Sequence, residues 1–201
     1  MRNKNKKITY APDWMLFWTG FIHSKVNESI CEDWGKKKSA KLQGIIHEVN
    51  KECENQIFEI RKEARVALAM KSDAKKKLID AEVVEESDSG VLAVEEIRDK
   101  RRKSAEKKEA ERTITDVKIR ISELKERMDN ILANHETSLG VILSNAKSKV
   151  TAYMMGVHAA GNKKCQIDVS MNDLEKYIFS GHLEIDGKII GEAKKVLEDE
   201  D

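Results

Sequence analysis

A heptad pattern runs through residues 114–131, which read ITDVKIRISELKERMDNI. Its apolar side chains alternate steps of three and four residues, which is the spacing of a coiled-coil seam. The seam residues are Ile114, Val117, Ile121, Leu124, Met128 and Ile131. A stripe of this kind is stable in water only when another surface covers it. The pattern therefore predicts a long α-helix that packs against a second helix.

The second helix is predicted to lie earlier in the chain and to begin near Ser39. From there the sequence consists mostly of Lys, Glu, Ala and Leu, which favour a solvated helix. The two helical patterns are separated by residues 86–90, ESDSG, a run of short polar side chains and Gly that is typical of a turn. Residues 36–164 are thus expected to form a long antiparallel helical hairpin, or coiled coil, with its tip near 86–90.

Three local features of this hairpin are also predicted. Residues 134–140 contain several weak helix formers, so a break or kink is expected there. The polar His135 lies on the apolar stripe and is expected to fix the register of the two helices. Gly161 is expected to end the second arm, because Gly readily adopts the left-handed conformation of a helix C-cap.

Basic residues gather near the predicted tip. A turn centred there places residues 71–77 beside residues 99–105, which brings two basic segments together. One interpretation is a basic collar that contacts the phosphates of a nucleic acid. The other is an ordinary solvated helical surface. The candidate phosphate contacts are Lys75, Lys76, Lys77, Arg98, Arg101 and Arg102.

Residues 1–35 combine a basic arm with most of the aromatic side chains. Pro12 suits the first turn of a helix and Gly35 suits a C-cap, so one helix is predicted between them. Its aromatic residues can pack on the hairpin, dock a protein partner or lie at a membrane surface. The membrane is the weakest of these alternatives, because the acidic Glu28, Glu32 and Asp33 share the predicted helix. The predicted docking residues are Trp14, Phe17, Trp18, Phe21 and Trp34.

Residues 165–201 form a small α+β appendage in this interpretation. A helix is predicted for residues 170–179, where Ser170 can act as its N-cap. Asp186-Gly187 lies between alternating apolar residues, which is a strong signal for a β-hairpin over 183–190. A short helix over 191–197 and an acidic tail complete the chain.

Composition narrows the class of protein. Charged residues make up 36% of the chain, but the formal net charge is only +1, so no global field favours nucleic acid or membranes. Cys31, Cys53 and Cys165 are odd in number and widely spaced, which predicts buried reduced thiols and a cytoplasmic location. The histidines lack metal-ligand spacing, and no nucleotide-binding or nucleophile motif occurs. We therefore expect no metal, no cofactor and no enzymatic activity.

These observations favour a non-enzymatic coiled-coil interaction or scaffold protein. Its hairpin would act as a spacer, and its aromatic N-terminal helix would dock protein partners. The apolar seam over 114–131 also suggests self-association into a homo-oligomer. The alternative is a nucleic-acid-binding accessory protein that uses the basic collar near the hairpin tip.

Overall fold

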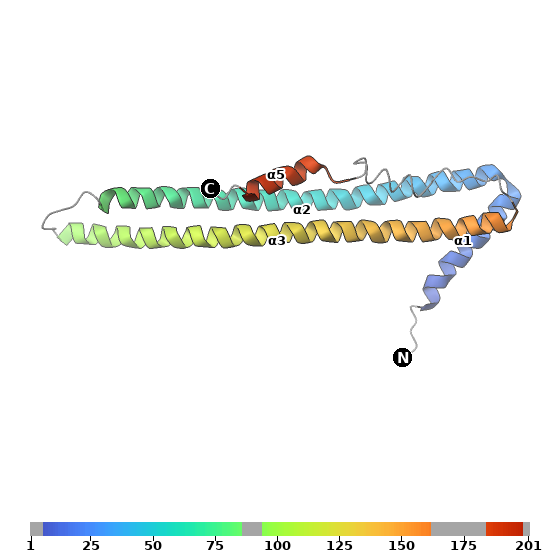
Figure 1. Ribbon diagram of the computed structural model, residues 1–201, viewed down its shortest axis with the longest axis horizontal. Coiled ribbons are helices and arrows are strands. Elements are labelled where there is room, and N and C mark those ends of the chain that lie inside the picture. Colours follow the sequence, from blue (N-terminus) through green and yellow to red (C-terminus); the bar gives the residue numbers. More distant parts are fainter. Residues whose placement is uncertain (1–5, 86–93, 162–183, 199–201) are drawn as a thin grey trace. The chain divides into compact units, whose positions relative to one another are not determined.

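The computed structural model describes residues 6–85, 94–161 and 184–198. They form the helices α1 (Lys6–Val26), α2 (Glu28–Glu85), α3 (Val94–Ala159) and α5 (Gly187–Glu198), and no strand occurs in these three ranges (Figure 1). The prediction of a mainly α protein is therefore confirmed. The predicted tip near 86–90, the helix over 170–179 and Cys165 lie outside the described residues.

The chain divides into two compact units, and both α2 and α3 contribute to each of them. Unit 1 comprises Met1–Cys53 and Ala133–Asp186, and unit 2 comprises Glu54–Leu132 and Gly187–Asp201. In unit 1, Leu42 and Ile46 of α2 form an apolar core with Leu139 of α3. Asn50 lies beside this core, with its side-chain oxygen 2.8 Å from Nε2 of His135. The polar His135 on the apolar stripe thus has a hydrogen-bonding partner on the other helix.

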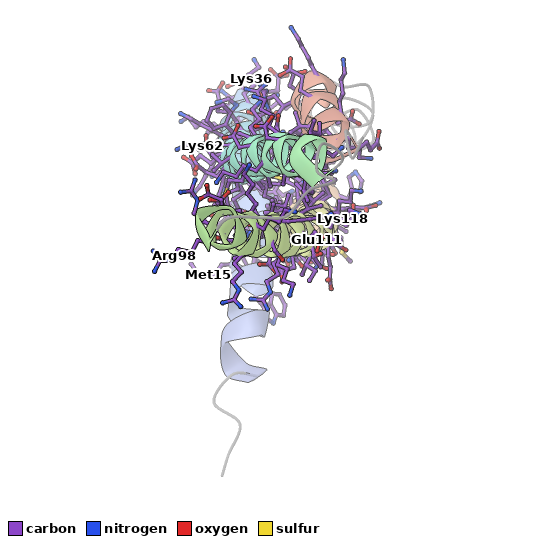
Figure 2. All side chains as sticks on the ribbon, turned by 90° about the vertical axis from the view of Figure 1, so that its left-hand side faces the viewer. Met15, Lys36, Lys62, Arg98, Glu111 and Lys118 are labelled. Carbon is purple, nitrogen blue, oxygen red and sulfur yellow. The ribbon has the colours of Figure 1, made fainter. Side chains whose placement is uncertain are left out.

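In unit 2, a cluster of charged side chains links α2 to α3. Arg120 and Arg127 donate hydrogen bonds to the two carboxylate oxygens of Glu63, at 2.7 and 3.2 Å. Hydrogen bonds to Glu123 and Glu63 raise the pKa of the Arg120 guanidinium above its ordinary value. Other charged side chains of the unit, such as Lys62, point away from the helix pair (Figure 2).

The first helix differs from its predicted bounds. It begins at Lys6 and ends at Val26, and Asn27 is the one non-helical residue between α1 and α2. Oδ1 of Asn27 accepts a hydrogen bond of 3.1 Å from the backbone N–H of Ser29, as an N-cap side chain does. The predicted end at Gly35 and the predicted start near Ser39 are therefore wrong. Gly35 is instead a buried residue within α2.

Two predictions about α3 have opposite outcomes. No break occurs at 134–140, because α3 is a continuous helix through that segment. The predicted end at Gly161 is confirmed: this residue has a φ of 80°, and its N–H donates a 2.9 Å hydrogen bond to the carbonyl of His158.

The C-terminal β-hairpin is wrong for the described residues, because Gly187–Glu198 is helix α5. Asp186 directly precedes the helix, in a position where Asp is among the preferred N-cap residues. Ala193 and Leu197, four residues apart, are buried on one face. Figure 1 shows α5 lying along α2, and Arg61 forms an ion pair with Glu192 there. The helix predicted over 191–197 is therefore correct but begins earlier.

Candidate docking face of α1

Helix α1 exposes an apolar face. Five of its large apolar side chains are between 50% and 70% exposed. At about 100° per residue, they occupy an arc of roughly 120° on the helix. We call this arc the α1 face, and its residues are Trp14, Met15, Trp18, Ile22 and Val26. The other exposed apolar residues in the described part of the chain, such as Phe58, do not belong to such a group on one short helix.

The opposite side of α1 crosses α3 at very close range. A Cβ at Gly20 would overlap the backbone carbonyl of Tyr153, and a Cβ at Gly156 would overlap the backbone carbonyl of Phe17. Only glycine fits at both positions, because the two backbones are in contact there. The crossing fixes which side of α1 faces the rest of unit 1 and which side remains exposed.

Tyr153 is the centre of the packing beside this crossing. Its ring stacks on Trp34 of α2, with a centroid distance of 3.7 Å and an interplanar angle of 4°. Its hydroxyl lies 3.0 Å from Nδ1 of His23 on α1. The buried Cys31 and Val157 belong to the same cluster. One tyrosine thus contacts α1 and α2 while it is itself part of α3.

The five predicted docking residues separate into two groups. Trp14 and Trp18 stack with centroids 5.9 Å apart, and Phe17 and Phe21 each meet Trp18 edge to face. These four rings form one cluster on α1, of which the two tryptophans are half exposed. Trp34, by contrast, packs inside unit 1 against Tyr153. The structure therefore brings four of the five residues together and places the fifth elsewhere.

The basic residues near the predicted tip do not face each other as expected. Residues 70–77 of α2 line a groove together with residues 106–113 of α3, so the predicted pairing with 99–105 is wrong by about two helical turns. Two acidic side chains of α3, Glu106 and Glu109, lie in that groove. Lys76 pairs with Asp73 at 3.8 Å, and Arg102 pairs with Glu106 at 3.2 Å. Lys75, Lys77, Arg98 and Arg101 are exposed.

The apolar seam of α3 is covered within the single chain. Val117, Ile121, Leu124 and Met128 are buried, while Ile114 and Ile131 are half-buried. These side chains are therefore not a free surface for a second copy.

Sequence reasoning missed part of this arrangement. The apolar period of the sequence places Met15, Ile22 and Val26 on the same stripe as the tryptophans, but the predicted docking residues did not include them. The crossing of α1 and α3 at Gly20 and Gly156 had no comparable signal, since nothing in the sequence brings together two glycines that are 136 positions apart. Cys31 and Cys53 are both buried, as predicted.

Comparison with known proteins gives no further guidance, because no family model, no curated protein and no solved structure matches the chain. Within the described ranges, no helix is both long enough and apolar enough to cross a membrane. The same ranges contain no group of three or more His, Cys, Asp or Glu side chains that could hold a metal ion.

Proposed function

We propose that this protein is a non-enzymatic interaction protein and that the α1 face docks a protein partner. One observation carries the proposal: five large apolar side chains are exposed along one side of a helix whose other side is packed on α3. Single exposed apolar residues are ordinary, but a contiguous apolar patch is typical of a binding surface. Tryptophan is also the residue type most enriched among binding hot spots.

The rigidity of the face favours tight docking. The Gly20–Gly156 crossing holds the backbone of α1 against α3, and stacking holds Trp14 against Trp18. Ordering of flexible side chains and segments reduces the free energy of binding, so a surface that is already ordered loses less.

Charge indicates the chemistry of the partner. Helix α1 carries Lys6, Lys7 and Lys25 but only one acidic residue, Asp13. A partner that offers an apolar groove with acidic side chains at its rim would complement this helix.

A lipid surface is the competing ligand. The acidic residues that argued against it in the sequence lie on α2 rather than on α1. A different argument now favours a protein: helices that bind the membrane interface present a strongly charged face to water, whereas the second face of α1 is packed against α3.

The remaining parts of the chain fit the same proposal. We infer that α2 and α3 act as the arms of a coiled-coil hairpin that carries the docking helix. Because the seam over 114–131 is covered, self-association would use the α1 face instead. The burial of Cys31 and Cys53 is consistent with cysteines that pack as small apolar residues in a reducing compartment such as the cytoplasm. Nucleic-acid binding has weaker support, because acidic side chains lie among the basic residues of α2 and α3.

The test compares capture by three forms of the tagged protein from its host lysate, each with and without nuclease treatment. The wild type is expected to retain a protein partner in stoichiometric amount, and because the contact is mainly apolar, this amount should fall much less with salt than binding to nucleic acid would. The double variant Trp14→Ser/Trp18→Ser is expected to lose the partner. Phe58→Ser removes an apolar side chain of similar exposure from α2 and should leave capture unchanged.

Two results would contradict the proposal. One is equal capture by the wild type and the tryptophan variant. The other is flotation of the wild type, but not of the tryptophan variant, with anionic liposomes in the absence of any captured protein, which would assign the α1 face to lipid. Recovery that depends on intact nucleic acid would instead support the alternative function, in which the basic residues of α2 and α3 bind nucleic acid.

A further inference from the structure

A second feature of unit 1 is a groove between α2 and α3, with a volume of about 290 Å³. It exists because three residues that line it are small: Gly35 and Ser39 on α2, and Ala146 on α3. Larger side chains at these positions would fill the space between the helices. The groove is distinct from the α1 face, because none of the five residues of that face lines it.

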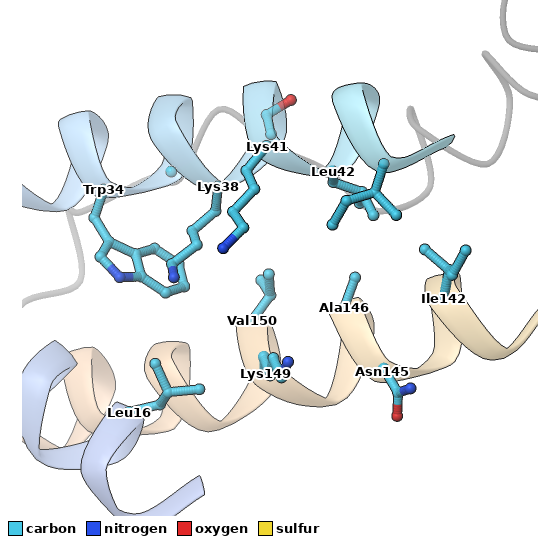
Figure 3. A pocket seen from close by; sticks show the side chains of 13 residues that line it. Leu16, Trp34, Lys38, Lys41, Leu42, Ile142, Asn145, Ala146, Lys149 and Val150 are labelled. Atoms are coloured by element: carbon cyan, nitrogen blue, oxygen red, sulfur yellow. The ribbon is translucent and has the colours of Figure 1, made fainter. Parts of the chain in front are cut away.

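The walls of the groove are mostly apolar. Figure 3 shows Leu42 of α2 above Ile142 and Val150 of α3, and Leu16 of α1 enters from one side. The indole of Trp34 lies on the same wall as Leu42. An aliphatic chain in this space would exchange contact with water for contact with these side chains, which is favourable.

The rim of the groove is cationic. Lys38 and Lys41 extend from α2 toward α3, and Lys149 lies on α3 (Figure 3). No Asp or Glu lines the groove, and among the described residues no carboxylate pairs with any of these three lysines. Lys38 instead lies over the Trp34 ring, 5.6 Å from its centroid. Three like charges around one apolar space repel one another, and an anion between them would relieve that repulsion.

We propose that this lysine-rimmed groove binds a carboxylate carried on an unbranched aliphatic tail, the chemistry of a medium-chain fatty acid anion. The tail would lie along Leu42, Ile142 and Val150, and the carboxylate would meet the ammonium groups of the lysines. The size agrees, because 290 Å³ corresponds to about ten water volumes and a methylene group is of similar size. The site does not depend on the proposed role of the α1 face.

The test is isothermal titration of the full chain with sodium decanoate, below the concentration at which it forms micelles. The wild type is expected to show one saturable site. Decanol has the same tail without the charge and should bind at least tenfold more weakly. Lys41→Gln/Lys149→Gln should weaken decanoate binding at least tenfold, because these exposed lysines supply two of the three rim charges.

Two control variants separate the groove from other surfaces. Lys36→Gln/Lys37→Gln removes the same charge from exposed positions of α2 outside the groove and should change the dissociation constant by less than twofold. Trp14→Ser/Trp18→Ser disables the α1 face and should retain decanoate binding, so failure of one proposal does not imply failure of the other. The proposal is overturned if decanoate shows no saturable binding, or if Lys41→Gln/Lys149→Gln binds it as tightly as the wild type. Loss of binding in the tryptophan variant alone would place the amphiphile on α1 and would also overturn it.

Discussion

Ser24 carries an unsatisfied hydroxyl. Its Oγ is a buried side-chain oxygen without a hydrogen-bond partner among the described residues. Ser24 lies four residues after Gly20 and so shares the side of α1 that crosses α3. A buried polar atom without a partner reduces stability. Ser24→Ala should therefore raise the free energy of unfolding by about 1 kcal/mol in urea titrations followed by circular dichroism.

Part of that gain comes from the higher helix propensity of alanine. Ser122→Ala, at an exposed position of α3, measures this part alone and should give the smaller increase. A destabilised Ser24→Ala protein would show that the hydroxyl has a partner in solution, such as a bound water molecule.

Gly156 and Gly140 lie on the same helix but in different surroundings. A methyl group at residue 156 would overlap the carbonyl of Phe17, whereas residue 140 has open space around it. Gly156→Ala should lower the free energy of unfolding by about 1–3 kcal/mol, because α1 must move away from α3. Gly140→Ala should raise it by about 0.5–1 kcal/mol, because alanine favours the helix. Urea midpoints that shift in the same direction for both variants would contradict the close crossing.

Helix α5 shows how one short sequence can satisfy two local rules. Asp186-Gly187 suits a tight β-turn, but the same Asp suits the N-cap of a helix. The structure has the helix, and its buried residues Ala193 and Leu197 lie one turn apart on one side, so packing of that side stabilises the helical alternative. Local turn chemistry alone could not decide between these structures, because the decision depends on tertiary packing.

The N-cap position of Asp186 has a testable consequence. A 12-residue helix is too short to be stable alone, so loss of its N-cap should destabilise the whole of α5. Asp186→Ala should destabilise α5 by about 1 kcal/mol and speed its amide hydrogen exchange roughly fivefold. Glu184→Ala, two residues earlier and outside the helix, should leave the exchange rates of α5 unchanged. Equal exchange rates in Asp186→Ala and the wild type would exclude an N-cap role.

Periodicity predicted the interior of the long helices better than their ends. The seam residues Val117 and Leu124 are buried as expected, because the spacing of apolar residues directly reports the buried side of a helix. The boundary at Asn27 was missed because Gly35 gave a more familiar end signal than a single N-cap residue. A glycine within a helix costs only about 1 kcal/mol, which packing readily offsets.

Across the chain, the candidate sites were harder to predict than the helices. The ring cluster of α1 follows from sequence spacing, since Trp14 and Trp18 are one turn apart. The lysine-rimmed groove does not follow from the sequence. Lys41 and Lys149 can be placed at one groove only if the pairing of α2 with α3 is already known. That pairing depends on where the connection is centred, and a small error there moves every facing pair. The predicted pairing of 71–77 with 99–105 failed for this reason.

The seam of α3 is the place to test whether copies of the whole chain associate. If copies of the protein pair through the seam, stability must rise with protein concentration, because dimer formation is linked to folding. If the seam is covered within one chain, as the burial of Leu124 indicates, the urea midpoint should be the same at 1 and 100 μM. We expect the second result. Leu124→Ala should then lower the free energy of unfolding by about 2–5 kcal/mol at both concentrations, because it leaves a cavity in the core.

Ile119 provides the matched control on the same helix. It is an aliphatic residue close to the seam, but more than half of its side chain is exposed. Ile119→Ala should therefore cost well below 2 kcal/mol, since little apolar surface returns to water. A wild-type midpoint that rises with concentration, together with a Leu124→Ala effect seen only in the associated form, would instead assign the seam to an interface between copies. In that case the α1 face would lose its role as the route of self-association, while its proposed role in binding other proteins would remain to be judged by the tryptophan variant.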